Sequence, residues 1–226
     1  MSAAPSSDAV TGFAPSFYDE EYFERGAITG ISGYMNYSWM PEQTLRMAHF
    51  IIQQLPIQAG ERVLDFGCAK GFLVKALRIL EVEAYGVDVS EYAVDQAPTE
   101  VHKHCTRITS CGDPGCFQQD YDWMISKDVF KHIAESDLAV LMTQARPRVK
   151  RVFAAIPLGI SDDSDRYVIP DYDRDVTHIT ARTPQWWAAL FERCGWRVDS
   201  FSYTFKGVKE NWTKAWPRGN GFFTLS

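Results

Sequence analysis

Apolar residues along the chain follow two alternating patterns. Strands are predicted at 62–66, 83–87, 107–109, 123–126 and 149–155, and residues 85–88 and 152–157 have the continuous apolar character of strands that are buried on both faces. Apolar residues spaced three and four apart predict helices at 41–55, 71–80, 92–97, 138–145 and 183–194. Because strands and helices alternate, the pattern indicates an α/β domain.

The segments that flank and interrupt this pattern have a different composition. Residues 1–12 are small and polar and are expected to form a disordered leader, and residues 13–59 are rich in aromatic residues and predict an N-terminal helical cap. The main domain is expected over 60–226, ending in a two-stranded hairpin with residues 206–220 between its strands. Residues 158–182 are too polar for a core and follow the fifth strand, so they predict a lid over a ligand.

The stretch from Val63 to Leu73 carries the clearest chemical motif. It reads as an apolar strand followed by a turn with Gly67 and Gly71, and a second strand ends in Asp88. A carboxylate about 20 residues after such a turn can accept both hydroxyl groups of a ribose. The glycine spacing differs from that of a dinucleotide fingerprint, and Asp65 before the turn suits a cationic ligand better than a phosphate. The motif therefore predicts a nucleoside-binding βαβ unit.

This motif resembles that of the class I S-adenosylmethionine-dependent methyltransferases, in particular the branch that acts on small molecules. Residues 63–73, 85–90, 121–133 and 187–196 carry the resemblance, which covers the chain from about residue 60 onward. It implies a Rossmann-like sheet of seven mostly parallel strands with helices on both faces and an antiparallel last strand. It also implies S-adenosylmethionine as the cofactor and S-adenosylhomocysteine as the product. The family usually has an acidic residue before the histidine at 132, where this chain has Lys131.

Ten residues are expected to bind the cofactor. Five of them, two acidic residues, two glycines and a cysteine, form the part of the site that we call the cradle. The others are expected near the adenine (Val89), near the methionine end of the cofactor (Ser126 and Lys127) and near the sulfonium (one of Tyr34 and Tyr37). The cradle residues are Asp65, Gly67, Cys68, Gly71 and Asp88. The alternatives are a generic βα turn, a solvated Lys127 and aromatic residues that only pack the cap.

Two histidines are candidates for a catalytic base. His178 ends the acidic lid segment and His132 follows the fourth strand, and each can take a proton near neutral pH. We rank His178 first because neighbouring aspartates could orient it, while a purely structural role is the alternative for both. The lid carboxylates could instead bind Mg²⁺ or Ca²⁺, attract an amine, or form a solvated loop. No metal site is predicted, although a divalent ion stays possible.

Composition narrows the range of functions. A net charge of −6 and a pI near 5.4 argue against a nucleic-acid partner. No apolar run is long enough to cross a bilayer, no secretory signal is visible, and five scattered cysteines are typical of reduced cytoplasmic thiols. We therefore expect a cytoplasmic enzyme, monomeric or homodimeric, that acts on a small molecule.

The expected reaction is methyl transfer to a small polar acceptor. O-methylation of a sugar, nucleotide-sugar or secondary metabolite is preferred, because a polar lid with carboxylates suits a hydroxyl-rich molecule. N-methylation of an amino sugar or another amine is the alternative within the enzyme class. A non-catalytic module that binds the cofactor is the alternative from another class, since fold alone does not establish turnover.

Overall fold

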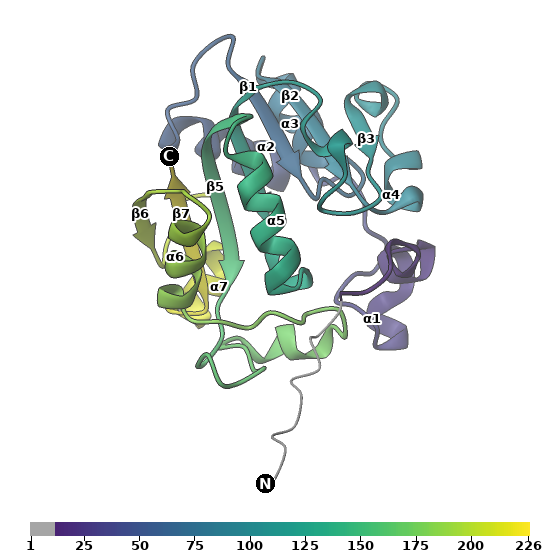
Figure 1. The fold of residues 1–226 in the computed structure, drawn as a ribbon. Helices are drawn as coiled ribbons and strands as arrows, with labels where there is room; N and C mark the ends of the chain where they lie inside the picture. The colour runs from purple at the N-terminus through teal and green to yellow at the C-terminus, as the bar shows by residue number, and fades with distance from the viewer. Residues whose placement is uncertain (1–11) are drawn as a thin grey trace, which may run out of the picture.

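A seven-stranded sheet forms the centre of the molecule (Figure 1). The computed structural model describes residues 12–226, so the predicted leader lies almost wholly outside the described residues. The strands follow the order β3-β2-β1-β4-β5-β7-β6. Their bounds are β1 (Arg62–Phe66), β2 (Glu83–Asp88), β3 (Cys105–Arg107), β4 (Tyr121–Lys127), β5 (Val149–Pro157), β6 (Val198–Ser202) and β7 (Asn220–Leu225).

The strand directions confirm the predicted fold class. Strands β1 to β5 pair in parallel, whereas β7 runs antiparallel to both β5 and β6 and lies between them. Because β1 pairs with both β2 and β4, the chain order reverses at β1. A crevice that can bind a ligand is expected outside the carboxyl ends of the strands at such a reversal.

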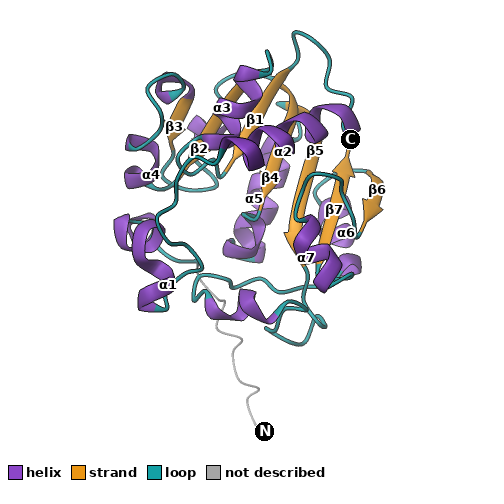
Figure 2. Ribbon diagram, turned by 180° about the vertical axis from the view of Figure 1, so that it is seen from behind, coloured by secondary structure: helices purple, strands orange, loops and turns teal. Residues whose placement is uncertain are grey.

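Helices cover both faces of the sheet. Figure 2 shows α2 and α3 on one face, and Figure 1 shows α5 and α6 toward the other. The α-helices are α1 (Gly26–Thr29), α2 (Pro41–Gln54), α3 (Phe72–Ile79), α4 (Glu91–Asp95), α5 (Glu135–Ala145), α6 (Pro184–Arg193) and α7 (Glu210–Ala215). Shorter helical turns are η1 (Pro15–Phe17), η2 (Glu21–Arg25), η3 (His102–His104), η4 (Pro114–Phe117), η5 (Phe130–His132) and η6 (Pro170–Arg174).

The core consists of two apolar layers separated by the sheet. Strand residues alternate between them, so that Leu64 and Met124 pack with α5 and α6 while Val63 and Trp123 pack with α2 and α3. A third, smaller cluster lies in the N-terminal segment around Tyr22. Burial on both faces explains why the central strands appear as continuous apolar runs in the sequence.

The structure divides the predicted N-terminal cap into two parts. Helix α2 packs against α3 and belongs to the layer on the sheet face. The segment with η1, η2 and α1 lies instead beyond the carboxyl ends of the strands, beside the segment 158–182 (Figure 1). A hydrogen bond from the Tyr22 hydroxyl to Asp175 joins these two segments. The chain therefore closes over the ligand-binding edge of the sheet from both sides.

The segment 158–182 is partly packed against the protein, whereas its acidic residues Asp162, Asp163 and Asp165 are exposed. Tyr167 is 2% exposed, Ile169 0% and Thr177 0%. The amides of Ile179 and Thr180 both donate to the carbonyl oxygen of Lys131, at 2.9 and 3.0 Å. The later part of this segment therefore packs at the edge of the sheet, beside Lys131.

The predicted third strand is displaced in the structure. It was expected at 107–109 and is found at Cys105–Arg107. This strand lies at the sheet edge and pairs only with β2. Because it has only three residues, it is too short to show a recognisable alternation of apolar and polar residues in the sequence. Among residues 12–226, no helix has the length and apolar character needed to span a membrane.

Candidate functional site

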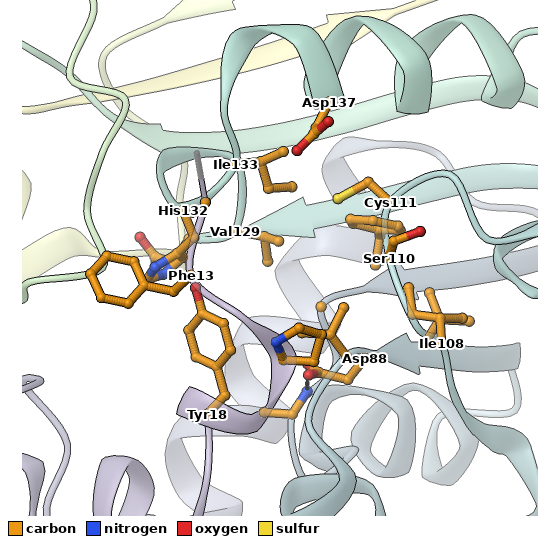
Figure 3. Close-up of a pocket in the computed structure, with 18 of the residues that line it drawn as sticks. Phe13, Tyr18, Asp88, Ile108, Ser110, Cys111, Val129, His132, Ile133 and Asp137 are labelled. Carbon is orange, nitrogen blue, oxygen red and sulfur yellow. Dashed lines mark hydrogen bonds between the residues drawn. The ribbon is translucent and has the colours of Figure 1, made fainter. Parts of the chain in front are cut away.

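A cavity of about 410 Å³ lies at the carboxyl ends of β1, β2 and β4. The loops after β1 and β2 form one side, segments 108–111 and 127–137 form another, and aromatic residues of the N-terminal segment cover it. Figure 3 shows Asp88, Val129 and His132 around the same space. The cavity therefore occupies the crevice that the reversal of strand order creates.

The loop after β1 is held against β2 by two backbone hydrogen bonds. The amides of Gly67 and Cys68 both donate to the carbonyl oxygen of Val87, at 2.8 and 3.0 Å. Gly67 has a φ of +81°, and a Cβ added there would lie 2.2 Å from Val129 Cγ2. Since both Gly67 and Val129 line the cavity, glycine is required here for the wall to close.

Gly71 and Cys68 belong to the same loop, but neither is among the residues that line the cavity. Gly71 has a φ of +67°, and a Cβ there would lie 2.6 Å from Cys105 Sγ. The Cys68 side chain is buried against Gly86, where an added Cβ would lie 2.7 Å from the Cys68 sulfur. The buried Cys68 side chain and the missing Cβ of Gly71 therefore allow this loop to pack closely against Gly86 and Cys105.

The Asp88 carboxylate is fixed at the end of β2 by backbone amides. Ala69 donates to Oδ2 at 2.7 Å and Ser90 donates to Oδ1 at 2.8 Å. Burial raises the pKa of Asp88, and these N–H groups oppose the increase. Each carboxylate oxygen keeps a further lone pair, and both Asp88 and Val89 line the cavity. The arrangement can accept two hydroxyl groups next to an apolar surface suited to a flat ring.

Asp65, Ser126 and Lys127 lie where the central strands end. Asp65 is buried, and burial together with the negative charge of Asp88 raises its pKa to about 7, against the opposing charge of Lys127. The Ser126 hydroxyl is buried and has no hydrogen-bond partner within the described residues. Of the three, only Lys127 lines the cavity.

Tyr34 and Tyr37 belong to the aromatic cluster that covers the cavity. Their ring centroids are 5.0 Å apart, and Tyr37 packs on Phe72 at 5.2 Å, at the start of α3. Tyr34 lines the cavity together with Tyr18 and Tyr22, whereas Tyr37 does not. Burial raises the pKa of both Tyr34 and Tyr37, so their hydroxyls are neutral. The structure thus brings Tyr34 to the site and places Tyr37 behind it.

His132 lines the cavity and is oriented by a chain of hydrogen bonds. Thr177 Oγ1 donates to Asp175 Oδ1 at 2.6 Å and lies 2.8 Å from His132 Nδ1. Because the hydroxyl proton of Thr177 goes to Asp175, His132 Nδ1 must carry the proton that Thr177 Oγ1 accepts. The lone pair of His132 is then on Nε2. Tyr22 completes the chain by donating to Asp175 Oδ2 at 3.0 Å.

His178 is close to His132 but is not among the residues that line the cavity. The two ring centroids are 4.7 Å apart. His178 Nδ1 donates to the carbonyl oxygen of Tyr172 at 2.6 Å, and its Nε2 lies 3.3 Å from Asp175 Oδ2. Burial and the charge of Lys131 lower the pKa of both histidines, that of His132 to about 3. Both rings are therefore neutral near pH 7, in contrast to the expectation of protonation in that range.

The only group in residues 12–226 with the spacing of a metal site is His132, Asp175 and His178, whose ligand atoms lie within 4.8 Å of one another. Protein hydrogen bonds already involve Nδ1 of both histidines and both oxygens of Asp175. The group is thus arranged as a hydrogen-bonded relay that orients His132.

A buried cluster of charges lies beside the cavity and was not predicted from the sequence. Asp128, which lines the cavity, is within ion-pair distance of the ammonium groups of Lys127, Lys131 and Lys209. Lys209 also donates to the Tyr172 hydroxyl at 2.7 Å and to Asn220 Oδ1 at 2.9 Å. Lysine at position 131, where the resembling family usually has an acid, was the one signal of this cluster in the sequence.

Three further residues of the relay, Tyr22, Asp175 and Thr177, were also missed. Tyr22 belonged to a general aromatic pattern, and Asp175 was one of several aspartates in an acidic segment. No local spacing connects Tyr22 with the other two, because it lies 153 positions from Asp175 and 155 positions from Thr177. Only the packing of segment 158–182 onto the N-terminal segment brings them together.

Comparisons with known proteins agree with this geometry. A family described as "Methyltransferase domain" matches residues 39–200. The chain belongs to this methyltransferase family. No curated protein is similar enough in sequence to count as a match. The matched residues begin just before α2, which supports placing that helix in the core of the methyltransferase.

Solved structures share the fold at low sequence identity. A Haloferax volcanii methyltransferase, solved with the Trm112 methyltransferase activator, is 14% identical with a TM-score of 0.61, covering 82% of this chain and 90% of its own. The glycopeptide N-methyltransferase MtfA, complexed with S-adenosyl-L-methionine, is 11% identical with a TM-score of 0.56, covering 79% and 86%. The mitomycin 7-O-methyltransferase MmcR is 13% identical with a TM-score of 0.57, covering 82% and 53%.

Family and fold together identify the chain as a class I methyltransferase. Its cofactor is S-adenosylmethionine. The residues present fit this cofactor, because a fixed carboxylate at the end of β2, a glycine loop and a neutral aromatic cover converge on one cavity. Since the structural relatives include both an O- and an N-methyltransferase, the fold leaves the acceptor open.

Proposed function

We propose that this enzyme transfers a methyl group to a hydroxyl oxygen of a small polar acceptor. The observation that supports the proposal most strongly is the relay of His132, Thr177 and Asp175, which leaves a lone pair on Nε2 of a histidine in the cavity wall. An alcohol keeps its proton near neutral pH and needs a base during transfer, so a fixed neutral imidazole favours O-methylation.

S-adenosylmethionine supplies a methyl group on a sulfonium when it is bound. In our proposal Asp88 accepts the ribose hydroxyls, Val89 packs near the adenine, and Lys127 faces the methionine end, with the buried Asp65 behind the cavity wall. The loop with Gly67, Cys68 and Gly71 and the buried Ser126 shape the cradle. Tyr34, supported by Tyr37, presents an aromatic face to the positive sulfur, an arrangement that cation–π attraction favours.

The protein contributes alignment, exclusion of water and a proton acceptor. Aromatic residues of the N-terminal segment line the cavity and limit the access of water to the acceptor oxygen. Segment 158–182 does not line the cavity and contributes through the contact of Thr177 with His132. His132 takes the hydroxyl proton on Nε2, and its Nδ1–H stays on Thr177. His178, which we first ranked as the base, has a positioning role in this proposal, because its Nδ1–H is donated to the Tyr172 carbonyl and it does not line the cavity.

N-methylation is less well supported by the charges around the cavity. An amine acceptor arrives as an ammonium ion and needs a carboxylate to attract it. The carboxylate of Asp128 in the cavity wall is already surrounded by three lysines, which repel such an ion. A hydroxylated acceptor meets no such repulsion.

A methyl-transfer assay on paired acceptors tests the proposal. The purified enzyme is incubated with S-adenosylmethionine and hydroxyl or amino versions of the same sugars, and products are identified by mass spectrometry. His132→Asn should lower turnover about 10²–10⁴-fold with little change in affinity for S-adenosylhomocysteine. His49→Asn, at an exposed histidine on α2, is the matched control. Transfer to amines alone, or full activity of His132→Asn, would contradict the proposal.

A further inference from the structure

The lysines around Asp128 have more hydrogen-bond donors than the protein uses. The ammonium of Lys209 donates to Asp128, Tyr172 and Asn220, so all three of its N–H groups are satisfied. Within residues 12–226, Lys127 donates only to Asp128 Oδ2, at 2.7 Å. Two further donors remain beside the cavity that Lys127 lines, one for the methionine end proposed above and one for a second acceptor.

Lys131 is the least satisfied of the three. Its side chain is 5% exposed, yet its single hydrogen bond in the part of the chain that the structure describes, to Asp128 Oδ1, is 3.5 Å long. The Tyr172 ring lies 4.9 Å from its ammonium nitrogen but offers no lone pair of an oxygen. Burying an ammonium without hydrogen-bond acceptors is costly, so this environment is incomplete as it stands.

The charges are also out of balance. Three ammonium groups surround one carboxylate, and Lys209 pairs with that same carboxylate. Burial lowers the pKa of Lys131, and it lowers that of Lys209 to about 7, even though Asp128 opposes both changes.

Two other acids face the cluster. Asp175 already accepts hydrogen bonds from Tyr22 and Thr177, and Asp65 takes up a proton near neutral pH. Neither acid supplies a free acceptor for the Lys131 ammonium.

We propose that Lys131 and Lys127 form an oxyanion subsite, so that the acceptor is a hydroxylated molecule carrying a carboxylate or a phosphate. This inference rests on the proposed function and specifies its substrate class. Lys131 is not itself among the residues that line the cavity, but it pairs with Asp128 and directly precedes His132, and both of these line it. An oxyanion that reaches the lysines therefore places a hydroxyl group of the same molecule near the base. Lys131, where related methyltransferases usually have an acidic residue, then has a role in selecting the acceptor.

Binding of matched probes to the enzyme saturated with S-adenosylhomocysteine tests the subsite. Calorimetry first measures binding of S-adenosylhomocysteine, and then glucuronate, glucose 1-phosphate and glucose are titrated separately. We expect at least one anionic probe to bind roughly tenfold or more tightly than glucose, since hydrogen bonds to charged groups contribute that much. Comparison of glucuronate with glucose 1-phosphate distinguishes a carboxylate from a phosphate.

Variants identify the lysine responsible. Lys131→Met should remove the preference for the anionic probe and keep affinity for S-adenosylhomocysteine, whereas Lys131→Arg should retain much of the preference. Lys150→Met, at an exposed lysine of β5, is the matched control and should bind like the wild type. Three results would overturn the subsite. They are equal binding of glucose and both anions, an unchanged preference for the anion in Lys131→Met, and binding of the anion only in the absence of S-adenosylhomocysteine. Failure to bind S-adenosylhomocysteine would instead contradict the proposed function.

Discussion

Replacement of Gly67 by alanine tests how the loop after β1 forms the cavity wall. An added Cβ would lie 2.2 Å from Val129 Cγ2 and 2.9 Å from Cγ1, and Gly67 has a φ of +81°. The left-handed conformation costs a residue with a Cβ about 1–2 kcal/mol. Overpacking against a stiff, β-branched valine adds about 1–3 kcal/mol. We therefore expect Gly67→Ala to lower the free energy of unfolding by about 2–5 kcal/mol.

Gly60 is a matched control for the conformational part of this cost. Its φ is +82°, but no atom lies within 4 Å of an added Cβ. Both substitutions change the entropy of the unfolded chain in the same way, so the difference between them isolates the contact with Val129. Gly67→Ala should thus cost about 1–3 kcal/mol more than Gly60→Ala.

Urea denaturation of both variants measures this difference, and calorimetry with S-adenosylhomocysteine measures its effect on the cavity. The double variant Gly67→Ala, Val129→Ala should recover part of the lost stability relative to the sum of the single variants. Equal unfolding free energies for Gly67→Ala and Gly60→Ala, with unchanged cofactor affinity, would refute the packing argument.

Three further predictions concern the buried polar groups. Burial raises the pKa of Asp65 from 3.8 to about 7, so near neutral pH the folded state holds a proton that the unfolded state releases. The free energy of unfolding without ligand should therefore fall as pH rises from about 4 to 7. Asp65→Asn should flatten this pH dependence in urea titrations, and an unchanged slope would contradict the prediction. Tyr22→Phe should cost about 1–3 kcal/mol by leaving buried Asp175 short of a donor, whereas Tyr92→Phe, at a less buried tyrosine, should cost less. Since His132 has a pKa of about 3, the rate should show no step from this residue between pH 5 and 8, and a step near 6.5 that His132→Asn removes would disprove the assignment.

The sequence predicted the central part of the fold because both faces of these strands are buried. The first strand was predicted at 62–66 and is found at Arg62–Phe66, and the helix predicted at 41–55 is found at Pro41–Gln54. The short edge strand at Cys105–Arg107 was misplaced, since it pairs with a single neighbour and lacks a periodic pattern. Burial thus determined which elements could be predicted.

The candidate site was predictable where it is local in the sequence. Gly67, Asp88 and Val89 belong to one βαβ unit, and the structure places all three at the cavity. The relay and the lysine cluster could not be predicted, because Lys209 and Asp128 are 81 positions apart and meet only through tertiary packing. The residues proposed to bind the cofactor therefore follow from a motif, whereas those proposed to face the acceptor depend on the whole fold.

Binding of S-adenosylhomocysteine to the wild-type enzyme and to Asp88→Ala tests the central claim most directly. The account predicts micromolar binding by calorimetry, weakened roughly tenfold or more in Asp88→Ala because a charged hydrogen-bond acceptor is lost. Asp95→Ala, at an exposed carboxylate of α4, should bind like the wild type. No binding to the wild type, tighter binding of NAD, or equal binding by Asp88→Ala would contradict the cofactor site described above.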